Sequence, residues 1–284
     1  MTDREATRLG TRLSQAASAS RGIVNRLRGG TQLVRYTYAV GPLEPAAHDA
    51  MASEPQWSTS VIETVPGIRL NGLIRRPNDP DAPWVIFFSG NDGTPLQTAK
   101  GFLDRLRGTD DWGIAVHAYR GYASSSGTPA RDPIAADALA LHSSLLADED
   151  VDPARMHIVA FSLGSYFAAH VVGEAAMQER PVASASILAP AESFAMVRDP
   201  RAERLTGGDV YELQPLLDHV PAPTLVVQGA ADSTTGVEQG RRTATRLGDR
   251  TRYLELAGVD HEELLDTDAA IAAVRSMITA PVPR

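Results

Sequence analysis

The feature that most constrains the fold of this chain is an apolar run that ends at a serine between small residues, at positions 158–164 with the sequence Ile-Val-Ala-Phe-Ser-Leu-Gly. The run predicts a buried strand, and the apolar residues that follow it predict a buried helix. A serine in the sharp turn between them has a strained backbone, so the residues two before and two after it must be small. Ala160 and Gly164 meet this condition. The pattern therefore predicts that the Ser162 hydroxyl stands above a sheet.

Strand and helix patterns alternate from about residue 58 onward. We expect an antiparallel hairpin over residues 58–65 and 68–75, strands at 84–88, 114–119, 157–160, 182–188, 224–228 and 251–256, and helices at 95–107, 133–147, 237–247 and 262–277. Such alternation predicts an α/β architecture, with a mostly parallel central sheet and helices on both of its faces. In such a sheet, sites form beyond the carboxyl ends of the strands.

Residues 1–57 differ from the domain that we place at 58–284. Residues 1–35 hold seven arginines against two acidic residues, a local net charge of +5, and their apolar residues predict a basic amphipathic helix. Residues 36–57 hold three prolines and predict an irregular connection. We expect the N-terminal extension to pack on its own domain. A homodimer contact and an anchor to a membrane or partner are the alternatives.

Residues 191–220 interrupt the alternation of strands and helices. They combine seven large apolar residues, among them Phe194 and Met196, with charged residues and a Gly207-Gly208 pair. Because the segment follows a strand end, we expect it to form a small cap over the site, built from two short helices. The alternative is a surface excursion that does not contact substrate.

Composition excludes several classes of protein. The net charge of −8 argues against a nucleic-acid binder, which needs a surplus of lysine and arginine. The absence of cysteine excludes disulfides, a thiolate nucleophile and cysteine metal sites, and no H-E-x-x-H motif is present. We therefore expect no metal and no cofactor. No apolar run is long enough for a transmembrane span and no secretory signal is evident, which predicts a cytoplasmic protein.

Two turns can supply the groups that a serine nucleophile needs, a base and an acid that orients the base. His261 lies between the strand at 251–256 and the last helix, and Asp232 follows the strand at 224–228. Both turns lie at the same sheet edge as Ser162. Ser165 is a weaker nucleophile candidate because it falls inside the helix. Glu192 is the reserve acid, whereas Asp260 and Glu262 flank the histidine, where neighbouring side chains usually diverge.

With these turns and the segment 119–129, Tyr-Arg-Gly-Tyr-Ala-Ser-Ser-Ser-Gly-Thr-Pro, the chain resembles the α/β-hydrolase superfamily over about residues 58–280. Within it, the segment is similar to the signature of the serine-aminopeptidase-like branch, which includes esterases and thioesterases. The resemblance implies the α/β-hydrolase fold and a catalytic triad of Ser162, His261 and Asp232. It says little about the substrate.

Two backbone N–H groups must form the oxyanion hole of such a site. We expect Leu163, directly after the nucleophile, and Asn91, in the Ser-Gly-Asn loop after the strand at 84–88, with Ser89 or Gly90 as alternatives to Asn91. This loop lacks the histidine that the family often has there, but the donor is main chain. For contacts with substrate we expect Ser89, Gly90, Tyr122, Phe194 and Met196.

These observations predict a serine hydrolase that cleaves an ester, thioester or amide of a small or medium acyl substrate through an acyl-enzyme. The apolar residues of the expected cap favour esters and thioesters. The alternatives are an acyltransferase, lyase or cyclase that uses the same site, and a binding protein that keeps the fold without catalysis.

Overall fold

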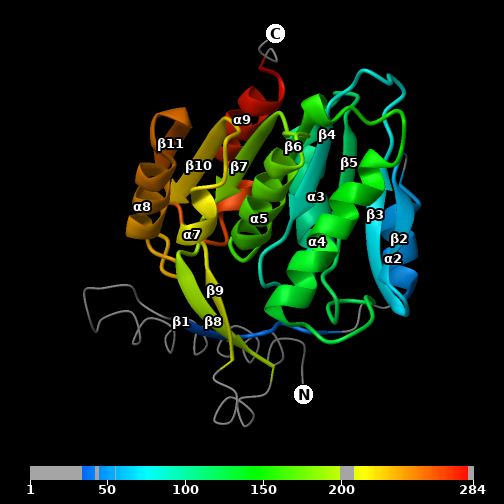
Figure 1. The fold of residues 1–284 in the computed structure, drawn as a ribbon, viewed down its shortest axis with the longest axis horizontal. Helices are drawn as coiled ribbons and strands as arrows, with labels where there is room; N and C mark the ends of the chain where they lie inside the picture. Colours follow the sequence, from blue (N-terminus) through cyan, green and yellow to red (C-terminus); the bar gives the residue numbers. More distant parts are fainter. Residues whose placement is uncertain (1–33, 42–44, 55, 199–207, 281–284) are drawn as a thin grey trace, which may run out of the picture.

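An eight-stranded sheet forms the centre of the protein. The computed structural model describes residues 34–41, 45–54, 56–198 and 208–280. The sheet has the order β11-β10-β7-β6-β4-β5-β3-β2 (Figure 1). Its strands are β2 (Ser58–Val65), β3 (Ile68–Arg75), β4 (Trp84–Phe88), β5 (Gly113–His117), β6 (Met156–Phe161), β7 (Ser184–Leu188), β10 (Thr224–Gly229) and β11 (Thr251–Leu256). β2, β3 and β5 pair antiparallel and the remaining pairs are parallel, which confirms the predicted mostly parallel sheet with an antiparallel hairpin.

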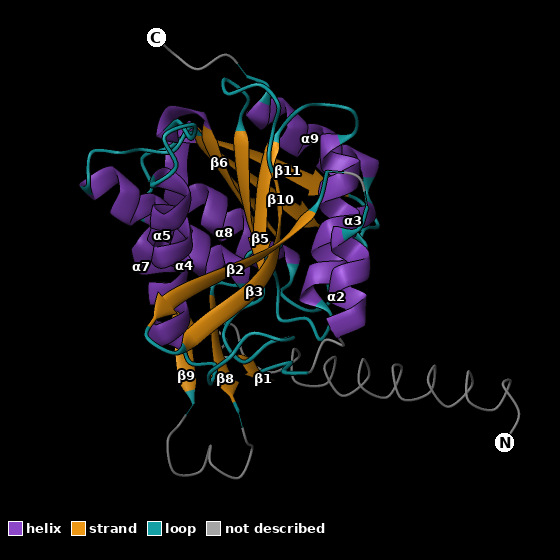
Figure 2. Cartoon of the chain, turned by 90° about the vertical axis from the view of Figure 1, so that its right-hand side faces the viewer, coloured by secondary structure: helices purple, strands orange, loops and turns teal. Residues whose placement is uncertain are grey.

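Helices cover both faces of this sheet, as predicted (Figure 2). One face carries α3 (Pro95–Arg107) and α9 (Asp268–Ile278), and the other carries α4 (Arg131–Leu146), α5 (Gly164–Met177), α7 (Gln214–Leu217) and α8 (Val237–Leu247). The last helix begins at Asp268 rather than at 262, because residues 264–266 form a 3-10 turn. Short 3-10 turns also occur at Pro153–Arg155 and Gly248–Arg250. None of the described helices is long and apolar enough to cross a membrane.

The middle strands are buried on both sides because helices cover both faces. All five residues of β4 (Trp84–Phe88) are buried, as are all five of β5. Their continuous apolar sequences are typical of central strands in parallel sheets, where alternation with polar residues is lost. The strand ends that carry Ser162 and the loop after β4 are therefore fixed to a rigid, fully packed layer.

A second, three-stranded sheet corrects two of our expectations. β1 (Val34–Thr37) pairs parallel with β8 (Ser193–Val197), which pairs antiparallel with β9 (Asp209–Glu212). The cap at 191–220 is thus a β-hairpin followed by the single short helix α7 in its described part, and not two short helices. The connection at 36–57 is also not irregular throughout, because it contains the end of β1 and the helix α2 (Pro45–Ala52). The predicted helix at 1–35 lies almost entirely outside the described residues.

The substitution Gly164→Ala tests how tightly β6 and α5 approach the core. A Cβ at Gly164 would lie 2.1 Å from the carbonyl oxygen of Phe88, a backbone atom that cannot turn away. We expect this variant to lose about 3 kcal/mol or more of unfolding free energy in urea titrations.

Gly101→Ala is the matched control for this experiment. Gly101 lies within the helix α3, and a Cβ there would meet no atom within 4 Å. Because alanine has the higher helix propensity, Gly101→Ala should gain about 0.5–1 kcal/mol. Equal effects of the two substitutions would contradict the close approach at Gly164.

Candidate active site

The turn at Ser162 has the strained geometry that its sequence predicts. Ser162 has a φ of +51°, in the left-handed region that residues other than glycine rarely adopt. Its N–H donates to the carbonyl of Leu188 at 2.9 Å, which fixes the turn to β7. The helix α5 begins at Gly164, and Ala160 is completely buried. The serine therefore stands at the carboxyl end of β6, between a buried strand and a buried helix.

His261 and Asp232 form a hydrogen-bonded pair at the same sheet edge. The Nδ1 atom of His261 lies 2.8 Å from Oδ2 of Asp232, and both residues are buried. The ring of His261 also packs against Phe161, with ring centroids 4.8 Å apart. This contact with the carboxylate assigns the proton to Nδ1 and leaves Nε2 as the basic nitrogen.

Asp232 is held ionised by the donors around it. Its carboxylate accepts hydrogen bonds at 2.8 Å from the N–H groups of Thr234 and Thr235, the Thr235 hydroxyl and the Gln228 amide. Burial raises the pKa of this carboxyl, but the hydrogen bonds and the charge of His261 outweigh burial and bring the pKa well below its usual range. Asp232 is thus a fixed anion that orients the imidazole.

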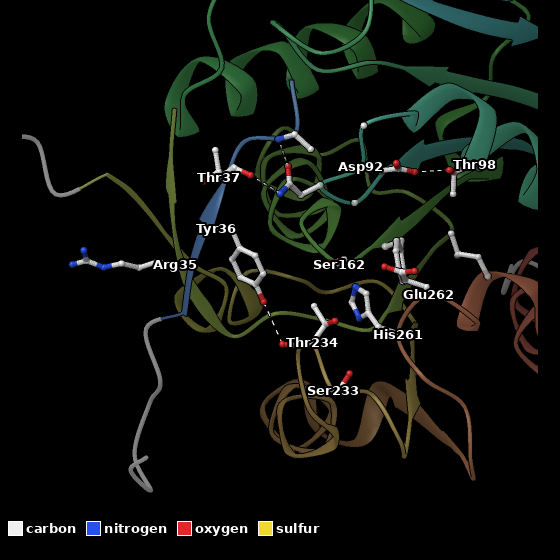
Figure 3. A pocket seen from close by; sticks show the side chains of 16 residues that line it. Arg35, Tyr36, Thr37, Asp92, Thr98, Ser162, Ser233, Thr234, His261 and Glu262 are labelled. Carbon is white, nitrogen blue, oxygen red and sulfur yellow. Dashed lines mark hydrogen bonds between the residues drawn. The ribbon is translucent and has the colours of Figure 1, made fainter. Parts of the chain in front are cut away.

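Ser162 and His261 line the same cavity, which has a volume of about 830 Å³. In Figure 3 Ser162 lies between Tyr36 on one side and His261 on the other, and Arg35 points away from it. These two described residues, Ser162 and His261, form no side-chain hydrogen bond with each other in this structure. Contacts between a nucleophile and its base are often long at rest and shorten in the Michaelis complex. The arrangement brings together the three residues that the sequence selected.

Two backbone segments flank Ser162 where an oxyanion would form. Leu163 occupies the N-cap position of α5, so its N–H belongs to the first turn of that helix, whose dipole favours negative charge. Gly90 follows β4, and a Cβ there would lie 3.3 Å from Cβ of Ser162. Asn91, next in this loop, lines the cavity. Leu163 thus follows Ser162 at the start of α5 and Asn91 lines the same cavity as Ser162, and their role as the two oxyanion donors stays a prediction.

The side chain of Asn91 has a role that the sequence did not reveal. Its Oδ1 accepts hydrogen bonds from the Ala39 N–H at 2.8 Å and the Tyr122 hydroxyl at 2.7 Å, and its Nδ2 donates to the Thr37 carbonyl at 3.0 Å. These bonds attach the end of β1 to the loop after β4. We call residues 34–39 the strap, since they run along the cavity and contribute Arg35, Tyr36, Thr37 and Ala39 to its wall.

Two of the expected substrate contacts lie behind the cavity wall. Tyr122 is completely buried, and its hydroxyl is used to hold Asn91. Ser89 is buried as well, and its carbonyl accepts a hydrogen bond from Tyr119 at 2.7 Å. Neither residue lines the cavities at Ser162, whereas Gly90, Phe194 and Met196 do.

The alternative candidates for the acid and for the nucleophile contact other groups or are buried. Glu192 pairs with Arg242 at 2.5 Å, and Asp260 accepts hydrogen bonds from the backbone N–H groups of Ser233 and His261. Ser165 is completely buried inside α5. Among the described residues, no three histidine or acidic side chains are grouped so that they could hold a metal ion. Asp232 is therefore the carboxylate that contacts His261 Nδ1.

The strap contributes residues that sequence reasoning missed. Tyr36 lies beside Ser162 in the cavity, and its hydroxyl donates to the carbonyl of Thr234 at 3.3 Å (Figure 3). The alternation of Val34, Tyr36 and Tyr38 was a signal for a strand, but nothing local indicates that this strand reaches the site.

The substitution Asn91→Ala distinguishes the role of the Asn91 side chain from that of its backbone N–H. The substitution keeps the N–H that we expect to bind the oxyanion and removes the two hydrogen bonds that hold the strap, together with the one from Tyr122. Because each such bond contributes about 1 kcal/mol, we expect KM to rise by about tenfold with a smaller change in kcat. Steady-state kinetics on the best ester substrate measure the changes in KM and kcat separately.

The control for Asn91→Ala is Asn78→Ala. Asn78 is exposed, does not line the cavity and donates a hydrogen bond to Asp111, so its loss should leave KM as in the wild type. A KM of Asn91→Ala equal to that of Asn78→Ala would show that the strap does not depend on this side chain.

The sheet order and the strand-turn-helix at Ser162 define the class: this is an α/β-hydrolase fold. Esterase Pf2001 from Pyrococcus furiosus shares the fold, with 14% identity, a TM-score of 0.64 and coverage of 90% of this chain and 100% of that chain. The esterase from Pyrobaculum calidifontis also shares it, with 17% identity, a TM-score of 0.61 and coverage of 86% and 100%. At these identities the likeness concerns the fold alone.

Closer relatives occur in Mycobacterium tuberculosis. Uncharacterized protein MT2364 of strain CDC 1551 / Oshkosh is 30% identical over 279 residues, which cover 93% of this chain and 92% of that protein. Uncharacterized protein Rv2307c of strain ATCC 25618 / H37Rv is 31% identical over 260 residues, with coverage of 86% and 85%. The chain belongs to the same family as these two proteins. No family model matches the chain.

Proposed function

We propose that the protein is a serine hydrolase that cleaves an ester or thioester through an acyl-enzyme. The observation that carries the proposal is the placement of Ser162, in its strained turn, in one cavity with His261, whose Nδ1 is bonded to Asp232. A serine becomes a useful nucleophile at neutral pH when a base removes its proton as it attacks. The similarity of the fold to that of esterases agrees with this chemistry.

In the proposed mechanism, Oγ of Ser162 attacks the carbonyl carbon while Nε2 of His261 takes the hydroxyl proton. The N–H groups of Leu163 and Asn91 bind the oxyanion. His261 then donates the proton to the departing alcohol or thiol, which leaves an acyl-serine. Water attacks this ester with His261 as base, and the carboxylic acid and free Ser162 are released. Asp232 stays ionised and stabilises the imidazolium in both steps.

Acyl transfer is the second candidate function, and the size of the cavity favours it. A volume of about 830 Å³ lies in the upper part of the range for ligand sites and leaves room for an acceptor beside the acyl-serine. An alcohol or amine bound there would replace water in the second step. The chemistry up to the acyl-enzyme is the same for both functions.

A panel of activated esters, thioesters and amides, assayed with the wild type and Ser162→Ala, tests the proposed function. We expect hydrolysis by the wild type and covalent labelling of Ser162 by a fluorophosphonate probe, read by intact mass. Equal rates for the two proteins, with no labelling of the wild type, would exclude a serine hydrolase. For acyl transfer, the measurement is the ratio of conjugate to free acid when candidate acceptors are added.

A further inference from the structure

One completely buried polar side chain beside the proposed triad takes no part in the proposed proton transfers. β10 has the sequence Thr-Leu-Val-Val-Gln-Gly, and all six of its residues are buried. Gln228 follows the apolar part of this strand and precedes the turn that carries Asp232. Because a buried amide lowers stability unless its polar atoms are bonded, the contacts of Gln228 indicate what the amide does.

The two polar atoms of the Gln228 amide differ in their contacts. Nε2 lies 2.8 Å from Oδ2 of Asp232 and 3.5 Å from the carbonyl oxygen of Gly229, whereas Oε1 has no hydrogen-bond partner among the described residues. An ionised carboxylate can only accept hydrogen bonds, so the NH₂ group of the amide must face Asp232. One buried oxygen is therefore left unpaired while the donor points at Asp232.

Stability of the fold does not account for a glutamine at this position. A buried polar atom without a partner is destabilising, and an apolar side chain of similar shape would avoid that cost. The three preceding residues of β10, Leu225, Val226 and Val227, are apolar and completely or almost completely buried. The contact with Asp232 is what distinguishes Gln228 from these neighbours.

The Asp232 oxygen that Gln228 contacts is also the one that contacts the proposed base. Oδ2 of Asp232 lies 2.8 Å from Nδ1 of His261 and from Nε2 of Gln228. A neutral donor on this oxygen fixes the rotation of the carboxylate and weakens its attraction for the protonated imidazole. We infer that Gln228 is a positioning residue that orients Asp232 and sets the pH range in which His261 acts as a base. This inference rests on the proposed function, which gives His261 that role.

A glycine on the neighbouring helix makes room for the amide. α8 packs against β10, and a Cβ at Gly240 would lie 2.7 Å from Cβ, 2.8 Å from Cγ and 2.9 Å from Oε1 of Gln228. Glycine within a helix is less favourable than alanine, so this position loses helix propensity where it meets Gln228. Gly240→Ala should therefore displace the amide from Asp232 while the residue at position 228 stays a glutamine.

The other titratable and charged groups near His261 and Asp232 are common to the wild type and to variants of Gln228. The turn of His261 carries Asp260, Glu262 and Glu263, and Arg35, Tyr36 and Asp92 line the cavity that His261 faces. The ion pairs of α8 join Arg241 to Glu238 and Glu255, and Arg242 to Glu192. Because these groups do not change, a difference between the pH profiles of a variant and the wild type reports on Gln228.

The pH dependence of kcat/KM, measured from about pH 5 to about pH 9 on the best ester, tests the inference. Gln228→Met keeps the length of the side chain and removes the donor. His261 should then hold its proton to a higher pH, so we expect the midpoint of the acid limb to rise by about 0.5 pH unit. Gln228→Glu should raise it further, because a second negative charge also stabilises the imidazolium. Gly240→Ala should shift it in the direction of Gln228→Met.

Thr243→Val is the matched control. Thr243 is completely buried on α8, three residues after Gly240, and in the described part of the chain its hydroxyl also lacks a hydrogen-bond partner. Its replacement should leave the midpoint as in the wild type. A shift in Thr243→Val equal to that in Gln228→Met would overturn the inference, because any change of packing between α8 and β10 would then suffice.

The possible results separate this inference from the proposed function. If the wild type cleaves esters and the Gln228 variants keep its midpoint, the inference is overturned and the proposed function stands. If Gln228→Met does not fold, Gln228→Glu and Gly240→Ala give the same comparison, and an unchanged midpoint in both overturns the inference. If the wild type neither cleaves esters nor reacts with a fluorophosphonate, the proposed function fails and the inference fails with it.

Discussion

Ser162→Ala should lower kcat/KM for the best ester by about 10⁵-fold or more, because the Ser162 hydroxyl is the group that forms the proposed acyl-enzyme. The loss should appear in kcat, since the hydroxyl acts on the reacting carbon and not in ground-state binding. Alanine removes one oxygen and keeps the Cβ, so the turn at φ +51° and the N–H bond to Leu188 are retained. Circular dichroism and urea unfolding of the variant should therefore match the wild type.

Ser165→Ala is the matched control for this experiment. Ser165 lies three residues further along, is completely buried in α5, and its hydroxyl has no hydrogen-bond partner among the described residues. Removing this hydroxyl should leave both activity and fluorophosphonate labelling at wild-type levels. If fluorophosphonate labelling persists in Ser162→Ala and disappears in Ser165→Ala, the nucleophile is Ser165 and not Ser162.

The turns that carry Ser162, Asp232 and His261 could be predicted because each is encoded locally. A glycine at position 164 is required by the close approach of α5 to the end of β4, where a Cβ would lie 2.1 Å from the carbonyl oxygen of Phe88. Strands that alternate with helices place their carboxyl ends at one edge, so the relative positions of the three turns follow from the sheet alone. The catalytic roles of these residues remain proposals.

The strap and the small sheet could not be predicted because their contacts are distant in the sequence. β1 pairs with β8, about 160 residues further along. No turn or residue spacing in either segment indicates that the two segments pair. Short strands of four or five residues depend on such partners, so local patterns do not distinguish the hairpin of β8 and β9 from two short helices. The expected contact of Tyr122 with substrate depends on a distant partner in the same way. Its hydroxyl donates to Asn91, which lies about 30 residues earlier in the loop after β4.

The strap lies before residue 58, where we expected the hydrolase domain to begin. The described end of the N-terminal extension, residues 34–39, contributes to the cavity wall and to the small sheet that carries Phe194 and Met196. A fragment that begins at residue 58 would lose the parallel neighbour of β8 and two of the three partners of the Asn91 side chain, Thr37 and Ala39. We therefore treat the strap as part of the proposed active site.

Asp232→Asn should lower kcat by about 10⁴-fold at neutral pH with a modest loss of stability. Oδ1 of Asp232 accepts from the backbone N–H groups of Thr234 and Thr235 and, at 3.5 Å, of Gly236, and Oδ2 accepts from Gln228, the Thr235 hydroxyl and His261 Nδ1. An asparagine that keeps its oxygen toward the backbone turns its NH₂ group toward His261. Nδ1 must then accept a hydrogen bond, so the proton moves to Nε2 and the imidazole can no longer take the proton of Ser162.

Glu192→Gln and Asp260→Asn are the matched controls for Asp232→Asn, since both were candidate acids and their carboxylates bind other groups, Arg242 in one case and backbone N–H groups in the other. Each should keep kcat near that of the wild type, and a large loss in either one would show that Asp232 is not the orienting acid.

The pH dependence of stability gives a second test of the role of Asp232. Because the pKa of Asp232 is lowered in the folded state, its contribution to stability is complete above about pH 4 and is lost as the pH falls further. Urea titrations at pH 5 and pH 3 should therefore show a smaller decline for Asp232→Asn than for the wild type, because the amide has no proton to gain.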